Sequence, residues 1–368
     1  MGLNATCFND RPSGARQRFV GLYGELIRRL PEVEFVIFEP SDCPVASWFN
    51  SAANVTARRT PIPSTGRARK AIEGGRYWRR ALANERLDIF EGFNLPFVKS
   101  PSGRTMQTIH DVRRLSPDWA LPERTAYKFF FKRALAQVDH LITVSETMKA
   151  EILSFYPDVE ISVVYNGLAE NAFDSVSVSD LIATQKKFAL PSKFILAVGH
   201  LEPRKNYLGL IDAIAWLRDA GEVIPLVIVG NESGLRKVIE ESIQKKRLSD
   251  SVKILSNLGD RELYSLYKLC DLFVFPSFYE GFGIPIVEAM GAGCPMILSD
   301  IPVFRELTQD KCTYFSPHDS SSIALAIQRV LQPGSQAPQI VKYGHERVKQ
   351  FGFNILGSQM EKLYRSMA

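Results

Sequence analysis

The sequence predicts an α/β protein of two Rossmann-like domains that face each other across a cleft, and three observations carry that prediction. The chain has 368 residues, which exceeds one ordinary core and fits two domains of roughly 150 to 200 residues each. Short apolar runs alternate with helical patterns, as in a parallel sheet with crossover helices. After a polar stretch at residues 169–187, the same alternation begins again.

The apolar runs give the order of the expected elements. In the first half the predicted strands are 2–8, 34–38, 105–109, 140–144 and 161–164, with helices at 15–30, 123–137 and 146–155. In the second half the strands are 194–198, 226–229, 252–255, 272–275 and 296–298, with helices at 207–220, 233–246, 260–269 and 285–291. A final helix at 353–367 has no strand after it. We therefore expect domains at 1–170 and 191–350, a linker at 171–190, and a C-terminal helix at 351–368 that packs back on the first domain.

Composition excludes several classes of protein. With 45% hydrophobic and 23% charged residues, the chain is globular rather than disordered. No apolar stretch reaches the roughly 18 to 20 residues that a membrane-spanning helix needs, so we expect a cytoplasmic protein. The five cysteines lack any C-x-x-C pair, which indicates neither a zinc site nor a disulfide framework.

The positive charge is concentrated in one segment. The formal net charge is +5, and residues 1–165 hold 23 basic against 18 acidic residues, so the first half carries all of the excess. Within it, residues 58–86 hold nine basic residues and two acidic ones. Because no nucleic-acid recognition motif accompanies them, we expect no nucleic-acid partner. We expect an anionic membrane surface or an acidic acceptor instead, at Arg67, Arg69, Lys70, Arg76, Trp78, Arg79 and Arg80. The adjacent Gly74 and Gly75 favour a mobile loop or two short helices there.

The most informative loop follows the predicted strand 272–275. It contains two glycines, and Pro285 suits the first turn of the next helix. The helix N-terminus is a ready anion site, with Glu280 at the loop entrance and Glu288 one turn into the helix. Either carboxylate alone could be an ordinary solvated or helix-dipole residue. Gly281 and Gly283 also partly match a dinucleotide fingerprint, which leaves an NAD-dependent oxidoreductase as a distant alternative, although Ile286 stands where the third glycine belongs.

A second loop follows the predicted strand 194–198. It carries Arg204 and Lys205, a forked donor and a point charge that together suit a diphosphate. No D-x-D tripeptide occurs in the chain. Without such an aspartate pair to hold a divalent metal, cationic side chains and helix dipoles must neutralise a leaving diphosphate. We therefore expect neither a metal nor a cofactor.

Two features of the first half belong to the same candidate site. His110 ends the predicted strand 105–109, where it can hydrogen-bond a sugar hydroxyl, although a lone histidine is more often structural. Gly14 lies in the loop that leads into the first helix and is a candidate phosphate contact. One glycine in a strand-to-helix turn needs no ligand to explain it.

Together these residues resemble the retaining GT-B glycosyltransferases of family 4. The resemblance rests on their order and spacing over nearly the whole chain: His110-Asp111, Val144-Ser145, Asn166-Gly167, Gly199 with the run from Glu202 to Asn206, Phe275-Pro-Ser277, and the run from Glu280 to Glu288. Two departures are His200, where some members have arginine, and Ser13-Gly14-Ala15, where many have a clearer glycine pair.

The resemblance implies a role for each residue. Glu288 binds the donor ribose, Arg204 and Lys205 clamp the phosphates, and His110 lies beside the transferred sugar. Glu280 and the backbone N–H groups of Gly281, Phe282, Gly283 and Ile284 hold the sugar and diphosphate. The first domain then takes the acceptor and the second a nucleotide-diphosphate sugar.

The resemblance also implies a donor and a place of action. The chain looks most like bacterial O-antigen and capsule mannosyltransferases in two places, the His110-Asp111-Val run followed by Ser116-Pro117 and residues 202–206. GDP-mannose is therefore the first expectation, with UDP- or dTDP-hexoses as alternatives. The acceptor is expected to be a growing surface glycan, lipid-linked at the inner face of the cell membrane. Front-face displacement without a protein nucleophile is the expected mechanism, and double displacement through Glu280 stays open.

Overall fold

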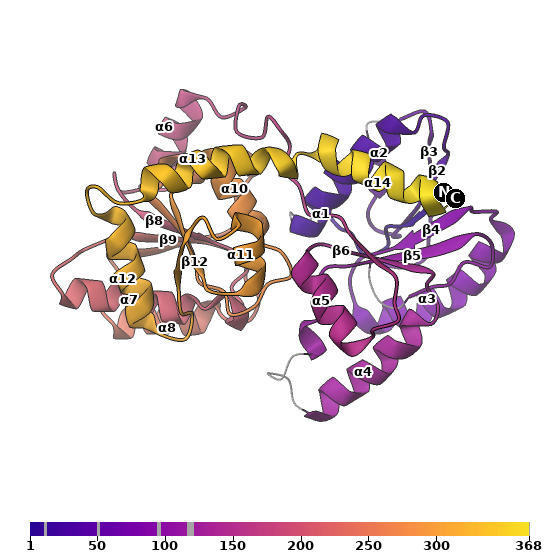
Figure 1. Cartoon of the computed structure of the whole chain (residues 1–368), viewed down its shortest axis with the longest axis horizontal. Coiled ribbons are helices and arrows are strands. Elements are labelled where there is room, and N and C mark those ends of the chain that lie inside the picture. Colours follow the sequence, from indigo (N-terminus) through magenta and orange to yellow (C-terminus); the bar gives the residue numbers. More distant parts are fainter. Residues whose placement is uncertain (11–12, 50–51, 94–96, 116–120, 368) are drawn as a thin grey trace. The chain divides into compact units, whose positions relative to one another are not determined.

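The computed structural model describes the whole chain except residues 11–12, 50–51, 94–96, 116–120 and 368. The chain forms two compact units, one of residues 1–167 with 352–368, and one of residues 168–351. Each unit is an α/β structure around its own parallel sheet (Figure 1).

The first unit is built on a seven-stranded parallel sheet in the order β3-β2-β1-β4-β5-β6-β7. Its strands are β1 (Gly2–Asn4), β2 (Phe35–Glu39), β3 (Val55–Arg59), β4 (Ile89–Gly92), β5 (Arg104–Ile109), β6 (His140–Thr143) and β7 (Ile161–Val163). Side chains alternate between the two faces of the sheet, so that Leu3 and Ile37 enter one core and Val36 and Phe38 enter the other.

Helices cover both faces of this sheet. One side has the continuous helical segment α1 (Gly14–Arg18), η1 (Phe19–Tyr23) and α2 (Gly24–Arg29), together with α14 (Phe353–Met367). The other side has α3 (Arg67–Ala81), α4 (Leu121–Leu135) and α5 (Glu146–Phe155) (Figure 1). This division follows from right-handed crossovers, because the connections from β1 through β2 to β3 run one way across the sheet and those from β3 to β7 run the other way. Short 3₁₀ segments η2 (Val45–Phe49), η3 (Leu82–Asn84) and η4 (Arg113–Leu115) complete the unit.

The basic segment is more regular than the sequence indicates. It contains strand β3 and one continuous helix, α3, which corrects the expectation of a loop or two short helices. The reason is that Gly74 and Gly75 cost the helix only about 1 kcal/mol each, while α3 packs Trp78 against Phe38 and Phe90 at ring-centroid distances of 5.3 and 5.6 Å.

The C-terminal helix α14 belongs to the first unit and lies beside α2 (Figure 1). Glycines make its close approach possible. A Cβ on Gly21 would lie 2.1 Å from the Phe353 ring, and one on Gly167 would lie 2.7 Å from it. Farther along, the hydroxyl of Tyr364 donates to the fully buried carboxylate of Glu91. Burial raises the pKa of Glu91, because a carboxylate away from water loses its hydration. Glu91 is therefore an internal hydrogen-bond acceptor and not a surface charge.

The second unit has a six-stranded parallel sheet in the order β10-β9-β8-β11-β12-β13. Its strands are β8 (Ile195–Val198), β9 (Leu226–Val229), β10 (Val252–Leu255), β11 (Leu272–Phe275), β12 (Met296–Ser299) and β13 (Thr313–Phe315). Its helices are α6 (Val178–Lys187), α7 (Tyr207–Asp219), α8 (Arg236–Lys245), α9 (Asp260–Leu269), α10 (Ile284–Ala292), α11 (Pro302–Thr308), α12 (Ser320–Leu331) and α13 (Ala337–Arg347), with 3₁₀ segments η5 (Pro203–Lys205) and η6 (Val348–Phe351).

The segment 171–190, expected as a linker, is part of the second unit and holds helix α6. A capping box begins this helix, since Ser177 and Asp180 bond each other's backbone N–H groups. Lys187 then forms an ion pair with Glu262 of α9 at 2.5 Å. The polar character of the segment reflects a surface helix and not a tether.

Candidate functional site

Two loops of the second unit meet at the point where its strand order reverses. Strands β8 and β11 are neighbours in the sheet, but the connections after them leave in opposite directions. Open parallel sheets bind ligands beyond the carboxyl ends of strands at such a point. The loop after β8 holds Arg204 and Lys205, and the loop after β11 holds Glu280. The two loops are joined directly, because the N–H of Phe278 donates to the carbonyl of Arg204 at 2.8 Å.

A compact ion cluster occupies this junction. Lys205 Nζ lies 2.6 Å from Glu280 Oε1, and Arg204 forms an ion pair with Glu280 Oε2. The hydroxyl of Ser277 donates to Glu280 Oε1 at 2.8 Å. On its other side, Arg204 lies 2.7 Å from Glu202. The structure thus brings together the two predicted phosphate cations and the predicted sugar-binding carboxylate.

Burial makes these charges depend on one another. Lys205 is 6% and Glu280 8% exposed. Burial alone would raise the pKa of Glu280, but Lys205 and Arg204 outweigh it and hold that pKa below its usual value. Burial lowers the pKa of Lys205, and Glu280 opposes that shift. Each charge in the cluster stabilises its partners, and removing one member would leave an uncompensated buried charge. The cluster is therefore held in one geometry.

The backbone around Lys205 requires two unusual residues. Gly199 has φ of 151°, and a Cβ there would lie 2.9 Å from Lys205 Cε, so glycine leaves room for the lysine stem. Asn206 takes a left-handed conformation with φ of 54°, and its amide donates to the carbonyl of Pro317 at 2.7 Å. Tyr207 begins α7 and donates from its hydroxyl to Gly199 O at 2.7 Å. The loop is therefore rigidly fixed.

The loop after Glu280 leads into α10. Gly283 is the N-cap, with φ of 131°, and Ile284 is the first helical residue. Phe282 is buried and packs edge-on against Phe351 at 5.9 Å. Because the Phe282 side chain belongs to the core, this segment offers a ligand its backbone. That arrangement agrees with the expected use of N–H groups at a helix N-terminus.

Glu288, which the resemblance assigns to the donor ribose, lies on α10 and is 5% exposed. Its Oε2 accepts a hydrogen bond of 2.9 Å from the Tyr267 hydroxyl of α9. Tyr267 keeps its proton, since burial and the neighbouring Glu288 charge raise its pKa well above the usual value. Tyr267 thus fixes the orientation of Glu288. The sequence gives no local signal for this partner, because Tyr267 occupies an ordinary buried position of an amphipathic helix.

The candidate residues of the first unit lie at the carboxyl edge of its sheet. His110 follows β5, and Arg18 ends α1. Arg18 is almost entirely buried and donates from Nη1 to the carbonyl of Val164 at 2.8 Å and to Asn166 Oδ1 at 3.3 Å. Burial, aided by the Arg18 charge, lowers the pKa of His110 to about 3. His110 is therefore a neutral imidazole near pH 7. Gly14, the other predicted contact, is the first residue of α1.

The predicted acceptor or membrane residues fall on α3. Arg69, Arg76 and Arg80 are exposed, and Lys70 is half-buried. Trp78 is 7% exposed in the core, so its assignment to a membrane contact is wrong. The amphipathic helix turns its apolar face, Trp78 included, toward the sheet. For Arg67 and Arg79 the helix path is described but the side chains are not, and Ser116 and Pro117 lie outside the described residues.

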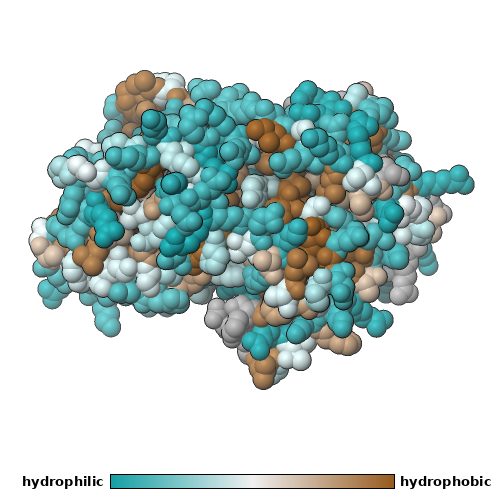
Figure 2. Space-filling view, in the orientation of Figure 1, coloured by the Kyte–Doolittle hydropathy of each residue, from teal (hydrophilic) through white to brown (hydrophobic). Residues whose placement is uncertain are grey.

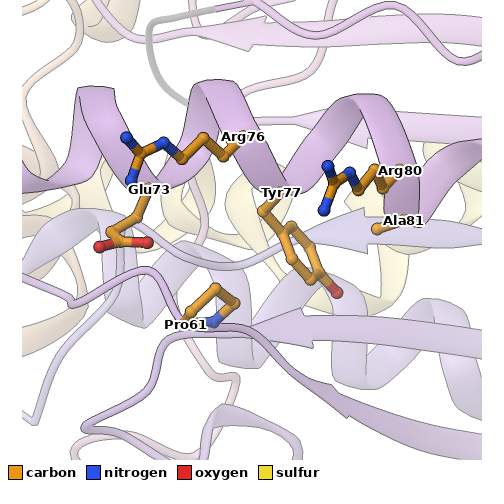
Figure 3. A pocket seen from close by; sticks show the side chains of 6 residues that line it. All are labelled: Pro61, Glu73, Arg76, Tyr77, Arg80 and Ala81. Carbon is orange, nitrogen blue, oxygen red and sulfur yellow. The ribbon is translucent and has the colours of Figure 1, made fainter.

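A shallow groove lies between α3 and the segment that holds Pro61 (Figure 3). It has a volume of about 350 Å³ and is lined by Pro61, Glu73, Arg76, Tyr77, Arg80 and Ala81. In that view the Arg80 guanidinium lies near the Tyr77 ring, whereas the Arg76 guanidinium points toward Glu73. A guanidinium group beside an aromatic ring suits an anionic group with an attached apolar or sugar part.

In the part of the chain that the structure describes, no group of three or more His, Cys, Asp or Glu side chains is placed to hold a metal ion. None of the described helices combines the length and the apolar character needed to cross a bilayer.

Family models match most of the chain. Residues 12–171 match the model described as Glycosyltransferase Family 4, and residues 179–347 match the model described as Glycosyl transferases group 1.

Two curated proteins resemble the chain in sequence. The O-antigen chain mannosyltransferase RfbU of Salmonella typhimurium is 30% identical over 250 residues, which is 67% of this chain and 65% of that protein. The O-antigen chain mannosyltransferase B of Escherichia coli is 27% identical over 290 residues, which is 77% of this chain and 76% of that protein. The chain thus spans between 65% and 76% of the length of these two relatives.

Solved structures resemble the chain over its full length. Sucrose-phosphate synthase from Thermosynechococcus elongatus has a TM-score of 0.79 at 20% identity and covers 99% of this chain and 98% of its own. Anabaena HepE, solved in complex with UDP and glucose, has a TM-score of 0.77 at 18% identity, with 100% of both chains covered. At these identities the likeness concerns the fold alone.

Proposed function

The chain belongs to the glycosyltransferases in which a family 4 domain precedes a group 1 domain, with the GT-B fold, and from that premise we propose that it transfers mannose from GDP-mannose to a lipid-linked surface glycan with retention of anomeric configuration. The observation that carries the proposal is the ion cluster of Arg204 with the buried Lys205 and Glu280 at the strand-order reversal of the second unit.

The chemistry we assign to this cluster begins with the donor diphosphate. Arg204 and Lys205 neutralise the phosphates, and the N–H groups of residues 281–284 add hydrogen bonds at the start of α10. Glu288, oriented by Tyr267, accepts from the ribose hydroxyls. The cations then stabilise the negative charge that grows on the phosphate as its bond to the sugar breaks.

We propose front-face displacement for the transfer step. The bond between the anomeric carbon and the phosphate oxygen breaks through an oxocarbenium-like state, and the acceptor oxygen bonds to that carbon on the same face. The departing phosphate oxygen takes the acceptor proton. The contacts of Glu280 support this route over double displacement, because a carboxylate that already accepts from Lys205, Arg204 and Ser277 is a poor nucleophile. In the first unit, neutral His110 is assigned a hydrogen bond to the sugar.

The donor assignment is supported by the relatives. RfbU and the Escherichia coli protein are both named mannosyltransferases, which favours GDP-mannose. HepE was solved with UDP and glucose, which keeps a UDP-hexose as the alternative. A thermal-shift comparison of GDP, UDP, dTDP and NAD identifies the base, because a ligand that binds only the native state raises its melting temperature.

The decisive experiment is turnover. We expect transfer from GDP-mannose to a lipid-linked glycan acceptor, lowered about 10²- to 10³-fold in Lys205→Ala and in Glu288→Ala with the fold intact. Transfer from UDP-glucose but not from GDP-mannose would contradict the assignment of GDP-mannose as the donor. If both variants kept more than about half of the wild-type turnover, neither side chain could make the strong charged contact that we assign to it, and the proposed site would be wrong.

The exposed cations of α3 are assigned to an anionic membrane surface. Arg69, Arg76 and Arg80 share one side of the helix with Ile72, which is 57% exposed. Basic residues near an anionic surface contribute about 1 kcal/mol each, so these three suffice for reversible binding at low salt. Co-sedimentation with phosphatidylglycerol vesicles and with neutral vesicles tests this. Equal binding to both would contradict electrostatic docking.

A further inference from the structure

Helix α4 carries large apolar side chains that are exposed to solvent. Phe129 and Phe130 are 65% and 67% exposed, and Leu121 is 65% exposed. The two rings contact each other edge-on at 5.8 Å, so they form one exposed cluster rather than two scattered side chains. Adjacent exposed aromatic residues expose apolar surface that water solvates poorly.

The inner side of α4 is already occupied. Phe131 is 2% exposed and packs against Phe97 and Tyr156 at ring-centroid distances of 5.7 and 5.5 Å. The Tyr156 hydroxyl donates to the carbonyl of Lys128 at 2.9 Å and fixes the rotation of the helix. Phe129 and Phe130 therefore cannot turn into this core without expelling Phe131. Their exposure is built into the packing of the helix.

Positive charge surrounds the exposed rings. Helix α4 contains four basic residues and one acidic residue, Arg124, Lys128, Lys132, Arg133 and Glu123. Three of the four basic residues lie within four positions of Phe129. Lysine and arginine can lay their apolar stems along a membrane interface and keep the charge at the headgroups, while neighbouring aromatic rings enter the acyl boundary.

The sheet topology places α4 on the same side of the first unit as the basic helix α3. Each helix belongs to a crossover connection, and the two connections run in the same direction across the sheet. Figure 1 shows both helices on the side opposite α2 and α14. In Figure 2 hydrophobic side chains reach the surface among hydrophilic ones at the end of the first unit formed by α4. One side of the unit thus carries both exposed cations and an exposed apolar cluster.

We propose that α4 is the apolar anchor of this protein on an anionic bilayer, with Phe129, Phe130 and Leu121 inserted into the interface and the neighbouring cations on lipid phosphates. This inference rests on the proposed function, whose lipid-linked acceptor calls for a membrane, and adds a second contact to that of α3. Charge complementarity selects the anionic lipid surface as the occupant, because a purely apolar protein partner would leave the flanking cations without counter-charges.

The test compares vesicle binding of matched variants of the whole chain. The double variant Phe129→Ser with Phe130→Ser removes the exposed rings without touching the inner side of α4. Its control is Val178→Ser with Ile182→Ser on α6, two side chains that are 72% and 50% exposed in the second unit. We expect the α4 variant to bind phosphatidylglycerol vesicles at least about tenfold more weakly than wild type, because the apolar burial is lost. The control should bind as wild type does.

A second readout locates the ring in the lipid. Phe129→Trp keeps an aromatic interface residue and should retain binding, with emission that shifts to shorter wavelength and is quenched by brominated phosphatidylglycerol. Wild-type binding by the double serine variant, or no quenching in Phe129→Trp, would overturn the assignment of α4. Absence of wild-type binding to any vesicle together with a concentration-dependent dimer would overturn it in favour of a second copy. GDP-mannose turnover with a water-soluble acceptor tests the proposed function separately, since it should be the same in wild type and the double serine variant.

Discussion

One buried carboxylate links the two cations of the candidate site. Glu280 accepts from the buried Lys205 and from the partly buried Arg204, which also pairs with Glu202. The diphosphate that we propose as the ligand brings more negative charge to the same cations. We propose that Glu280 serves two functions, which substitution can separate: it holds the cations in place without ligand, and it faces the sugar during transfer.

Glu280→Gln keeps the shape of the side chain and removes its charge. We expect the free energy of unfolding to fall by about 3 kcal/mol, because breaking a buried ion cluster leaves its partners uncompensated. GDP should bind more tightly than in wild type, since the competing carboxylate is gone, while transfer falls. Denaturant unfolding and calorimetry measure the two effects. Glu346→Gln, which removes a surface ion pair with Lys349, is the control and should change neither by more than about 1 kcal/mol. Weaker GDP binding in Glu280→Gln would contradict this role.

The neutral state of His110 predicts a pH dependence of stability. Its pKa falls from 6.5 to about 3 in the folded chain, so the unfolded chain binds an extra proton between these values. The stability that this group contributes is complete above pH 6.5 and is lost as the pH falls toward 3, with a slope of up to about 1.4 kcal/mol per pH unit. His110→Gln should reduce that slope in denaturant titrations between about pH 6 and 4, a range that lies between the unfolded and folded pKa of His110. An unchanged slope would show that His110 is protonated in the folded chain.

At the scale of elements, the predictable parts are those with a local pattern. Strands β9, β10 and β11 and helices α9 and α14 have the predicted bounds, because each strand is a mostly apolar run and each helix has a clear amphipathic period. The sequence does not predict strands β3, β4 and β13. β3 is an edge strand, and its sequence from Val55 to Arg59 has three exposed residues and ends in two arginines, so no apolar run marks it.

The candidate site follows the same rule. Arg204, Lys205, Glu280 and Glu288 could be predicted because they lie in loops and a first turn that directly follow buried strands. The direct pairing of Lys205 with Glu280 could not, since it joins residues 75 positions apart. The burial of Trp78 could not be predicted for another reason. The basic residues around it dominate the local pattern, and the packing against Phe38 depends on a strand far away in sequence.

Helix α3 offers a test of why two adjacent glycines do not break it. A Cβ on Gly75 would meet no atom within 4 Å. Gly75→Ala should therefore raise the free energy of unfolding by about 0.5 to 1 kcal/mol through helix propensity alone. Gly21→Ala makes the opposite control, because its Cβ would lie 2.1 Å from the Phe353 ring, and it should destabilise the chain. Thermal unfolding measures both. A destabilised Gly75→Ala would mean that α3 needs a glycine there for another contact.

At the scale of the whole molecule, the chain leaves its first unit after residue 167 and returns to it at residue 352. The returning helix α14 inserts Leu356, Met360 and Tyr364 into the core of the first unit. A chain that ends at residue 351 should therefore lose hydrogen-exchange protection in residues 1–167 and keep it in residues 168–351. Loss spread equally over both units would contradict this division.

We propose that the cluster of Arg204, Lys205 and Glu280 binds the diphosphate of a nucleotide sugar, and calorimetric titration of GDP measures that binding. Wild type should bind GDP, and Lys205→Ala should bind it about 10- to 100-fold more weakly, as expected for the loss of a charged hydrogen bond. Lys237→Ala, which removes a cation that is 90% exposed on α8, should bind as wild type does. Equal GDP affinity in Lys205→Ala and wild type would show that this cluster does not bind the diphosphate.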